Sequence, residues 1–232
     1  MAATLLGKLG RWFGASLPDA PRHGLVGRPD LWQMKRAFQI DFLRRRGLQP
    51  THRVLDIGCG SLRGGAALIA YLEPQGYCGI DVRESVLAEA RRELRREKLS
   101  AKLPRLVLAS DMAPLDLQSR FDVLWAFSVL FHLADPILDA CLLMAARHLE
   151  PKGVFFANVI LGDGLPGEWQ GFPVVPRTLE AYRILALRHG LHTCVLGTLA
   201  ELGHRCGDPS QDEQCMLAFS SNPDNVARSL CR

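Results

Sequence analysis

Hydrophobic residues along the chain fall into short continuous runs that alternate with longer stretches of helical spacing. The short runs, which are typical of buried strands, lie at residues 54–57, 77–80, 106–109, 121–126 and 154–160. Helical spacing marks residues 63–72, 84–97, 136–149 and 178–189. Because strands that alternate with helices pair as parallel neighbours, the pattern predicts a parallel sheet covered by helices on both faces.

The last part of the chain breaks this alternation. Residues 192–196 and 214–219 are two strand-like runs with no helical stretch between them. Antiparallel strands can be joined directly, whereas parallel neighbours need a crossover. We therefore expect a Rossmann-like α/β fold, with a seven-stranded, mostly parallel sheet that includes a C-terminal antiparallel strand.

Three segments are expected along the chain: residues 1–29, 30–222 and 223–232. Residues 1–23 have the spacing of a short basic amphipathic helix, which fits a tail, a helix packed on the body, an organelle-targeting segment, or a weak membrane-surface contact through residues 1–16. Asp30 can cap a helix that ends near Gly47 and opens the single domain at 30–222. The remaining ten or so residues are expected to form a C-terminal tail.

The composition is that of a globular protein, with 48% hydrophobic and 22% charged residues among 232. No apolar run reaches the roughly 18 residues of a membrane-spanning helix, and no secretory signal pattern opens the chain, so we expect a cytoplasmic protein without a transmembrane segment. The first 48 residues hold nine Lys and Arg against three Asp, and the rest is net negative. Nucleic-acid binders more often spread basic residues over the folded body, which disfavours nucleic acid as a partner.

The seven cysteines are scattered without a C-x-x-C pair, and several lie in apolar segments, as reduced, packed cysteines do. Five residues offer ligand atoms for zinc, but their spacing matches no standard finger or ribbon. These residues are His192, Cys194, His204, Cys206 and Cys215. We therefore expect no metal site.

A glycine-rich turn follows the first strand, where the chain reads V-L-D-I-G-C-G-S-L-R-G-G over residues 54–65. In α/β sheets, ligands bind at the carboxyl ends of the strands, and Gly58 and Gly60 let the backbone approach a ligand closely. The dinucleotide fingerprint G-x-G-x-x-G fails, because Arg63 stands where its third glycine belongs. Asp56 favours a sulfonium cofactor with an ammonium group, since a carboxylate repels a pyrophosphate.

The sequence D-x-G-x-G, with Asp81 ending the next strand, resembles motif I and its successor in the class I S-adenosylmethionine-dependent methyltransferases. The order of elements over residues 47–219 is similar to that family. The resemblance implies S-adenosylmethionine as the cofactor, with its methionine part at the glycine turn, its ribose at Asp81 and its adenine at Asp111. The implied cofactor-binding residues are Asp56, Gly58, Cys59, Gly60, Arg63, Asp81, Asp111, Phe127 and Ser128.

The turn departs from many family members at Leu62, where they have a third glycine. Residues 61–65, S-L-R-G-G, resemble a largely uncharacterised bacterial subset with the same turn. Within this turn Arg63 is either a ligand of the cofactor carboxylate or a surface arginine at the start of a helix.

Methyl transfer is an in-line displacement, so the protein mainly aligns the acceptor and moves one proton. The resemblance places residues 126–133 beside the methyl-transfer site, with His132 as a candidate catalytic base. The alternative is that His132 only ties down the loop before Asp135. His204, in the loop before the last strand, is a second candidate base.

The segment 161–177 is long for a connection between a strand and a helix and is rich in glycine. Its Trp169 and Phe172 either cover an apolar or planar acceptor or pin a surface loop. Trp32 on the N-terminal helix is expected to supply another wall of the acceptor site.

Taken together, these features predict a methyltransferase that acts on an oxygen or nitrogen of a small or medium-sized acceptor. Two alternatives stay open. The protein is either a methyltransferase that acts on a peptide, a protein or RNA docked on the basic first 48 residues, or a cofactor-binding scaffold without turnover. A dinucleotide oxidoreductase is the remaining rival. The oligomeric state does not follow from the sequence.

Overall fold

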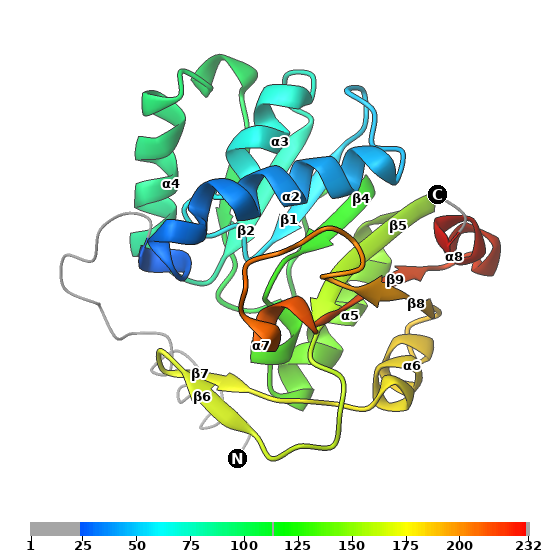
Figure 1. Ribbon diagram of the computed structural model, residues 1–232. Helices are drawn as coiled ribbons and strands as arrows, with labels where there is room; N and C mark the ends of the chain where they lie inside the picture. Colours follow the sequence, from blue (N-terminus) through cyan, green and yellow to red (C-terminus); the bar gives the residue numbers. More distant parts are fainter. Residues whose placement is uncertain (1–23, 113, 231–232) are drawn as a thin grey trace, which may run out of the picture.

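A seven-stranded sheet forms the centre of the computed structural model, which describes residues 24–112 and 114–230 (Figure 1). The expected amphipathic segment at 1–23 lies outside the described residues. The order across the sheet is β3-β2-β1-β4-β5-β9-β8. In chain order these strands are β1 (Val54–Ile57), β2 (Tyr77–Asp81), β3 (Arg105–Leu108), β4 (Phe121–Ala126), β5 (Leu149–Val159), β8 (His192–Thr198) and β9 (Cys215–Ser220).

The strand directions confirm the expected topology. β1 pairs in parallel with β2 and β4, and parallel pairing continues to β3 on one side and β5 on the other. β9 pairs antiparallel with both β5 and β8. The connection from β8 to β9, in which the structure has a short helix that the sequence pattern did not predict, therefore inserts one reversed strand into an otherwise parallel sheet.

Helices cover both faces of the sheet, because each buried strand points alternate side chains to opposite sides. Val54 belongs to a core cluster under α2 (Trp32–Arg45), α3 (Gly65–Tyr71) and α4 (Glu84–Arg96). Its neighbour Leu55 belongs to the other cluster, under α5 (Asp135–His148) and α6 (Leu179–Leu187). The sheet is thus the middle of three layers, and the carboxyl ends of β1, β2 and β4 open on one common edge.

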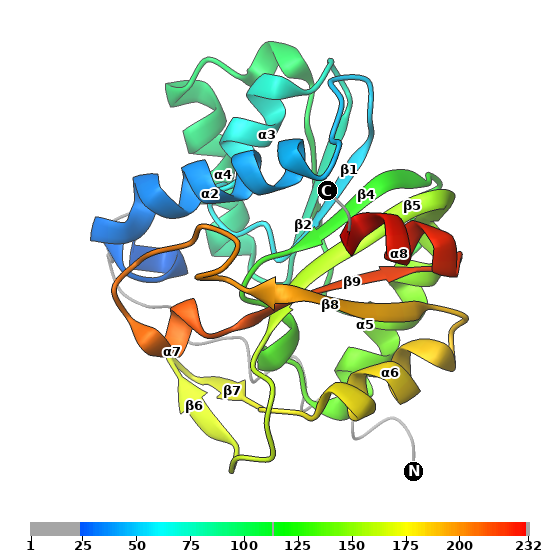
Figure 2. The ribbon, with the colours of Figure 1, turned by 45° about the vertical axis from the view of Figure 1, so that its right-hand side comes forward.

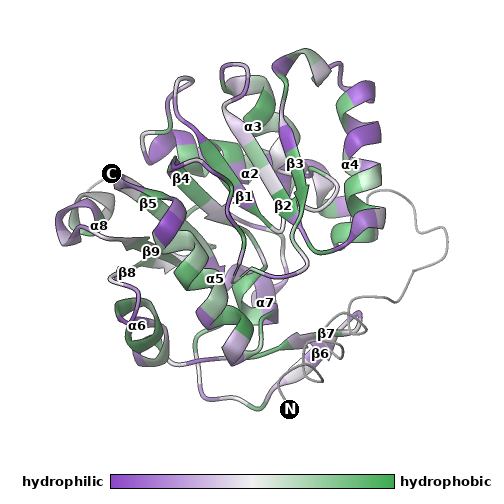
Figure 3. Ribbon diagram, turned by 180° about the vertical axis from the view of Figure 1, so that it is seen from behind, coloured by the Kyte–Doolittle hydropathy of each residue, from purple (hydrophilic) through white to green (hydrophobic). Residues whose placement is uncertain are grey.

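In the surface helix α4, the spacing of polar and apolar residues determines which face packs against the sheet. Its Leu87, Ala90 and Leu94 are buried, whereas Arg91 and Arg95 are exposed. Figure 3 shows hydrophilic and hydrophobic residues along the same helix, as a helix with one solvent face requires. Among the described residues, no helix is both long and apolar enough to cross a membrane.

Two expectations about the ends of the folded chain, the cap at Asp30 and the C-terminal tail, were wrong. Asp30 does not cap α2, because it lies within a 3₁₀ helix, η2 (Pro29–Leu31), and its carboxylate pairs with Arg28 at 2.6 Å. The segment after residue 222 is not a tail, because Pro223–Leu230 forms α8. α8 lies against β8 and β9 (Figure 2), where Val226 is buried and its carbonyl accepts from the Cys194 thiol.

Two short elements lie where β5 ends (Figure 1). The long segment 161–177 contains the hairpin β6 (Gly167–Trp169) and β7 (Phe172–Val174) rather than an irregular loop. The connection from β8 to β9 contains a short helix, α7 (Pro209–Asp212), which Asp208 caps by accepting from the Ser210 N–H. Both insertions border the carboxyl edge of the sheet.

A hydrogen bond through the core attaches α2 to the sheet. The Trp125 indole Nε1 donates to Gln39 Oε1 at 2.9 Å, and both side chains are buried. Gln39 Nε2 in turn donates to the Lys35 carbonyl one turn earlier. The amide orientation is therefore determined at both ends, and this anchors the part of α2 that reaches the carboxyl edge.

We expect Gln39→Met to lower the free energy of unfolding by about 1–3 kcal/mol, because the buried Trp125 N–H then has no acceptor. Urea denaturation of the ligand-free protein measures this change. Gln49→Met, at an exposed glutamine, is the control and should shift stability by less than about 0.5 kcal/mol. Equal stability of the two variants would contradict an anchoring role for Gln39.

Candidate active site

The turn after β1 has a left-handed backbone at three positions. Gly58, Gly60 and Leu62 have φ values of 70°, 57° and 66°. A Cβ on Gly58 would meet the Val129 side chain at 2.5 Å, and one on Gly60 would meet the Val26 side chain at the same distance. Both glycines are thus required by space and by conformation. Leu62 adopts the conformation that favours glycine, and its side chain is fully buried in the core.

Asp81 ties this turn to the end of β2. Its Oδ2 accepts from the Gly60 N–H at 3.0 Å, and its Oδ1 accepts from the Arg83 N–H at 2.9 Å. The N–H groups of Gly58 and Cys59 also donate to the Ile80 carbonyl. The carboxyl ends of the two strands are therefore joined at the point where ligands bind in α/β sheets.

Asp56, the acid before the turn, is buried and accepts from the Tyr77 hydroxyl at 2.6 Å. Burial raises the pKa of Asp56 to about 7, although the bond from Tyr77 opposes this change. Burial also raises the pKa of the Cys59 thiol well above its usual range. Cys59 is therefore a neutral packing group at neutral pH, and Asp56 can change its charge there.

Arg63 is buried, not a surface arginine, since its side chain is only 8% exposed. Its Nη1 donates to the Val26 carbonyl, and its Nε has no partner within the described residues. Burial lowers the pKa of Arg63 to about 10, which leaves the guanidinium charged at neutral pH. A buried charge of this kind favours a bound anion nearby.

One cavity of about 970 Å³ joins nearly all the residues that the sequence singled out. It runs along the carboxyl edge from the turn after β1 to the β6–β7 hairpin and α7. Twelve of the fourteen predicted site residues line it: Asp56, Gly58, Cys59, Gly60, Arg63, Asp81, Asp111, Phe127, Ser128, His132, Trp169 and Phe172.

Trp32 and His204 do not line this cavity. Trp32 is buried on α2 under the Arg36 guanidinium, so its neighbours Lys35 and Gln39 reach the cavity instead. His204 is fully buried and packs edge-on against Phe38. The expectations that Trp32 walls the acceptor site and that His204 acts as a base therefore gain no support from their positions.

His204 does contribute to a cluster of ligand-type side chains. Its Nδ1 lies 2.8 Å from Asp212 Oδ1, and the cluster includes the Cys206 thiol, with all three ligand atoms within 4.8 Å of one another. Asp212 also accepts from the N–H groups of Cys206 and Gly207. The carboxylate thereby holds the loop before α7, which accounts for the cluster without a metal.

His132 lines the cavity from the 3₁₀ helix η4 (Leu130–His132). Its Nδ1 lies 2.8 Å from the Pro173 carbonyl, which can only accept, so Nδ1 carries the proton and Nε2 has the lone pair. Burial is the main cause that lowers the pKa of His132, and the charge of Arg83 adds to it. The ring is therefore neutral at pH 7 and able to accept a proton.

The hairpin surrounds this imidazole with aromatic groups. The ring centroids of Trp169 and Phe172 lie 5.7 Å and 5.9 Å from that of His132. The Arg83 guanidinium lies over Phe172 at 5.2 Å, and its Nε lies 3.6 Å from Asp81 Oδ1. The lid expected from Trp169 and Phe172 is thus connected to the carboxylate that ends β2.

Sequence reasoning missed a polar network at the other end of the cavity. The backbone N–H of Ser128, whose φ is 61°, donates to Asn158 Oδ1, and Asn158 Nδ2 donates to Gln214 Oε1. Lys35 and Gln211 extend the polar wall. No local motif marks these residues, because the network joins four segments that are far apart in the chain.

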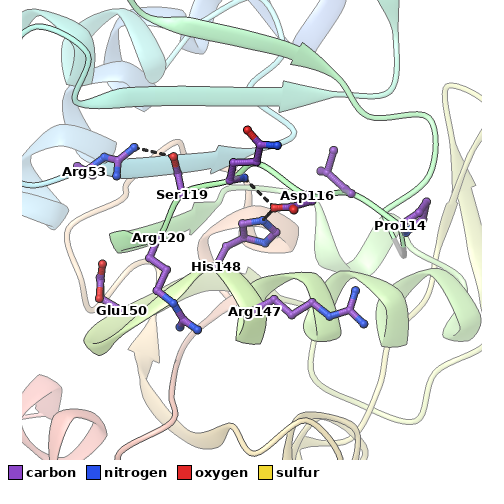
Figure 4. Close-up of a pocket in the computed structure, with 10 residues that line it drawn as sticks. Arg53, Pro114, Asp116, Ser119, Arg120, Arg147, His148 and Glu150 are labelled. Carbon is purple, nitrogen blue, oxygen red and sulfur yellow. Dashed lines mark hydrogen bonds and ion pairs between the residues drawn. The ribbon is translucent and has the colours of Figure 1, made fainter.

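A second hollow, of about 680 Å³, lies apart from the glycine turn, near the start of β4 (Figure 4). It is lined by Arg53, Arg120 and Arg147, but also by Asp116 and Glu150. The Arg53 guanidinium donates to Ser119 Oγ, and that of Arg120 donates to the Leu149 carbonyl. These bonds connect neighbouring loops, and none of the predicted site residues lies here.

The sequence of this chain is similar to those of known methyltransferases. A family model described as a methyltransferase domain matches residues 55–155. A ubiquinone biosynthesis O-methyltransferase of Hahella chejuensis is 29% identical over 154 residues, which is 65% of this chain and 56% of that protein. The match thus spans little more than half the length of that relative.

Solved structures share the whole fold. The CcbJ methyltransferase from Streptomyces caelestis has a TM-score of 0.62 and 18% identity, over 88% of this chain and all of the other. Magnesium protoporphyrin IX methyltransferase from Synechocystis, with S-adenosylhomocysteine bound, has a TM-score of 0.63 and 15% identity, over 94% of this chain and 95% of the other. The matched methyltransferase domain, the strand order and the glycine turn with Asp81 together support a class I S-adenosylmethionine-dependent methyltransferase.

Proposed function

We propose that the protein transfers a methyl group from S-adenosylmethionine to an oxygen or nitrogen of a small or medium-sized acceptor. The observation that carries this proposal is the single cavity, which has the family's cofactor turn at one side and a neutral histidine under aromatic rings at the other. The 3₁₀ helix η1 (Gly24–Val26) and the hairpin both border it. A cavity bordered on two sides in this way suits a small molecule better than a long polymer.

The cofactor is expected to occupy the part of the cavity between the glycine turn and Asp111. Asp81 would accept hydrogen bonds from the ribose hydroxyls, and Arg63 would bind the carboxylate beside the Gly60 turn. Asp56, when ionised, would favour the positive charges of the ligand. Phe127 and Ser128 follow β4 and would border the methionine part.

Bound S-adenosylmethionine would supply an electrophilic methyl group on a sulfonium, so that the acceptor's lone pair would bond to the methyl carbon as the carbon–sulfur bond breaks and the neutral thioether is released. The protein's task is then to align the acceptor and remove its proton. His132 Nε2 is positioned to take that proton, because Nδ1 is engaged with the Pro173 carbonyl.

We expect Asp81→Ala to weaken the binding of S-adenosylhomocysteine by about 10-fold to 100-fold or more, because a charged acceptor for the ribose is lost. Isothermal titration calorimetry measures the affinity. Asp41→Ala, at an exposed carboxylate on α2, is the matched control and should bind as the parent does. Parent-like affinity in a folded Asp81→Ala protein would refute the assignment of the cofactor site.

His132→Ala should reduce kcat by about 10²-fold to 10⁴-fold while cofactor affinity is retained, because only proton removal is lost. The assay follows radiolabelled methyl transfer to a panel of hydroxylated and aminated aromatic compounds. His192→Ala, at an exposed histidine of β8, should retain full activity.

The pH profile gives a second test of the same residue. Because the pKa of His132 is lowered, the reactive neutral ring persists to lower pH, and kcat should rise with pH along a limb below 6.5. This limb should be absent from His132→Ala. If the variant keeps both the rate and the limb, another group removes the proton.

A further inference from the structure

A buried lysine lines the cavity beside the residues of α7. Lys35 is on α2, is only 7% exposed and lines the cavity together with Gln211 and Gln214. Its ammonium group donates to Gln211 Oε1 at 2.5 Å. An ammonium carries three N–H donors, so this bond leaves two of them available for a ligand.

The orientation of Gln211 is fixed by its other end. Gln211 Nε2 donates to Asp208 Oδ2 at 2.7 Å, so the amide oxygen must face Lys35. Asp208 also accepts from the N–H and the hydroxyl of Ser210 at the start of α7. The ammonium is therefore held by a built chain of hydrogen bonds rather than by a flexible surface contact.

Lys35 and Arg63 are two buried cations in one cavity, and neither forms an ion pair with a carboxylate among the residues that the structure describes. The other cavity arginines do have such partners, since Arg28 pairs with Asp30 and Arg83 with Asp81. Asp56 attracts the charge of Arg63 and Asp208 that of Lys35, but neither carboxylate forms an ion pair with the cation. A buried charge without a paired counter-ion is costly, so each cation favours an anionic group of a ligand.

The cofactor brings only one carboxylate. Arg63 follows the Gly60 turn and is the cation expected to take it under the proposed function. Lys35 has no carboxylate within ion-pair distance among the described residues, although the more distant Asp208 attracts its charge, and it lines the cavity together with residues of α7. Burial and the positive charges of Arg63 and Arg28 lower the pKa of Lys35 to about 8, so the ammonium form still predominates at neutral pH.

We propose that Lys35 binds a carboxylate of the methyl acceptor, so that the substrates are small acids, with an aromatic or other planar body under Trp169 and Phe172. This inference rests on the proposed function and narrows it to a class of acceptor. Lys35 acts as a specificity-determining residue: it holds the acid at one end of the cavity while the reacting oxygen or nitrogen faces the methyl group.

Matched acids and amides test the proposal. The probes are para-hydroxybenzoate, phenylacetate and indoleacetate, each against its own amide, titrated into the protein loaded with S-adenosylhomocysteine. At least one acid should bind about tenfold or more tightly than its amide, because a charge-assisted hydrogen bond is replaced by a neutral one. Lys35→Met should abolish the difference, and Lys152→Met, at an exposed lysine, should keep it.

If the Lys35→Met protein does not fold, the same titrations are carried out with Lys35→Gln, whose side chain can still donate to Gln211. The proposal is overturned if every acid and its amide bind equally, if none of the probes binds, or if the preference survives the loss of Lys35.

A second measurement separates Lys35 from the cofactor site. S-adenosylhomocysteine and its decarboxylated analogue are compared in the parent, Lys35→Met and Arg63→Met proteins. Lys35→Met should keep the parent's preference for the carboxylate form, and Arg63→Met should lose it. Loss of that preference in Lys35→Met would assign the lysine to the cofactor and overturn the proposal.

The two failures are distinguishable. If the parent protein binds no S-adenosylhomocysteine, the proposed function fails, and the acid and amide titrations on the unloaded protein still decide whether Lys35 binds a carboxylate.

Discussion

The bond from the Gly60 N–H to the Asp81 carboxylate is the constraint on which the rest of the site depends. It joins the turn after β1 to the end of the parallel neighbour β2. The same turn has a left-handed conformation at Leu62, which costs energy in a residue other than glycine. The complete burial of the Leu62 side chain in the core offsets that cost.

Buried charge is the second organising feature. Asp56, Arg63 and Lys35 all lie in one cavity, where desolvation shifts the pKa of each toward its neutral form. A protein that needed these groups only for folding would gain from replacing them with apolar residues of similar size. Their retention in a cavity is more readily explained by a ligand that carries charges of both signs.

The sequence predicted most of the sheet, and gathered the proposed cofactor residues that line one cavity, because those signals are local. The run at 54–57, its glycines and Asp81 lie within thirty or so residues, and the spacing alone gives their relative positions. The missed features depend on distant partners. Lys35 meets Gln211 across most of the chain, and Asn158 lies between Ser128 and Gln214. Trp32 is buried on α2 and does not line the cavity, whereas Lys35 and Gln39 of the same helix do.

The two halves of the cavity come from different parts of the chain. Residues that end β1, β2 and β4 line the part of the cavity that we propose for the cofactor, where left-handed turns restrict the backbone. The part that we propose for the acceptor is lined by α2, by the hairpin after β5 and by α7 before β9, which are a helix and two insertions outside the parallel strands. The Pro173 carbonyl, in the hairpin, sets the tautomer of His132. A change in the hairpin can therefore alter both the shape of the proposed acceptor site and the proposed base, and through Phe172 and Arg83 it also reaches Asp81.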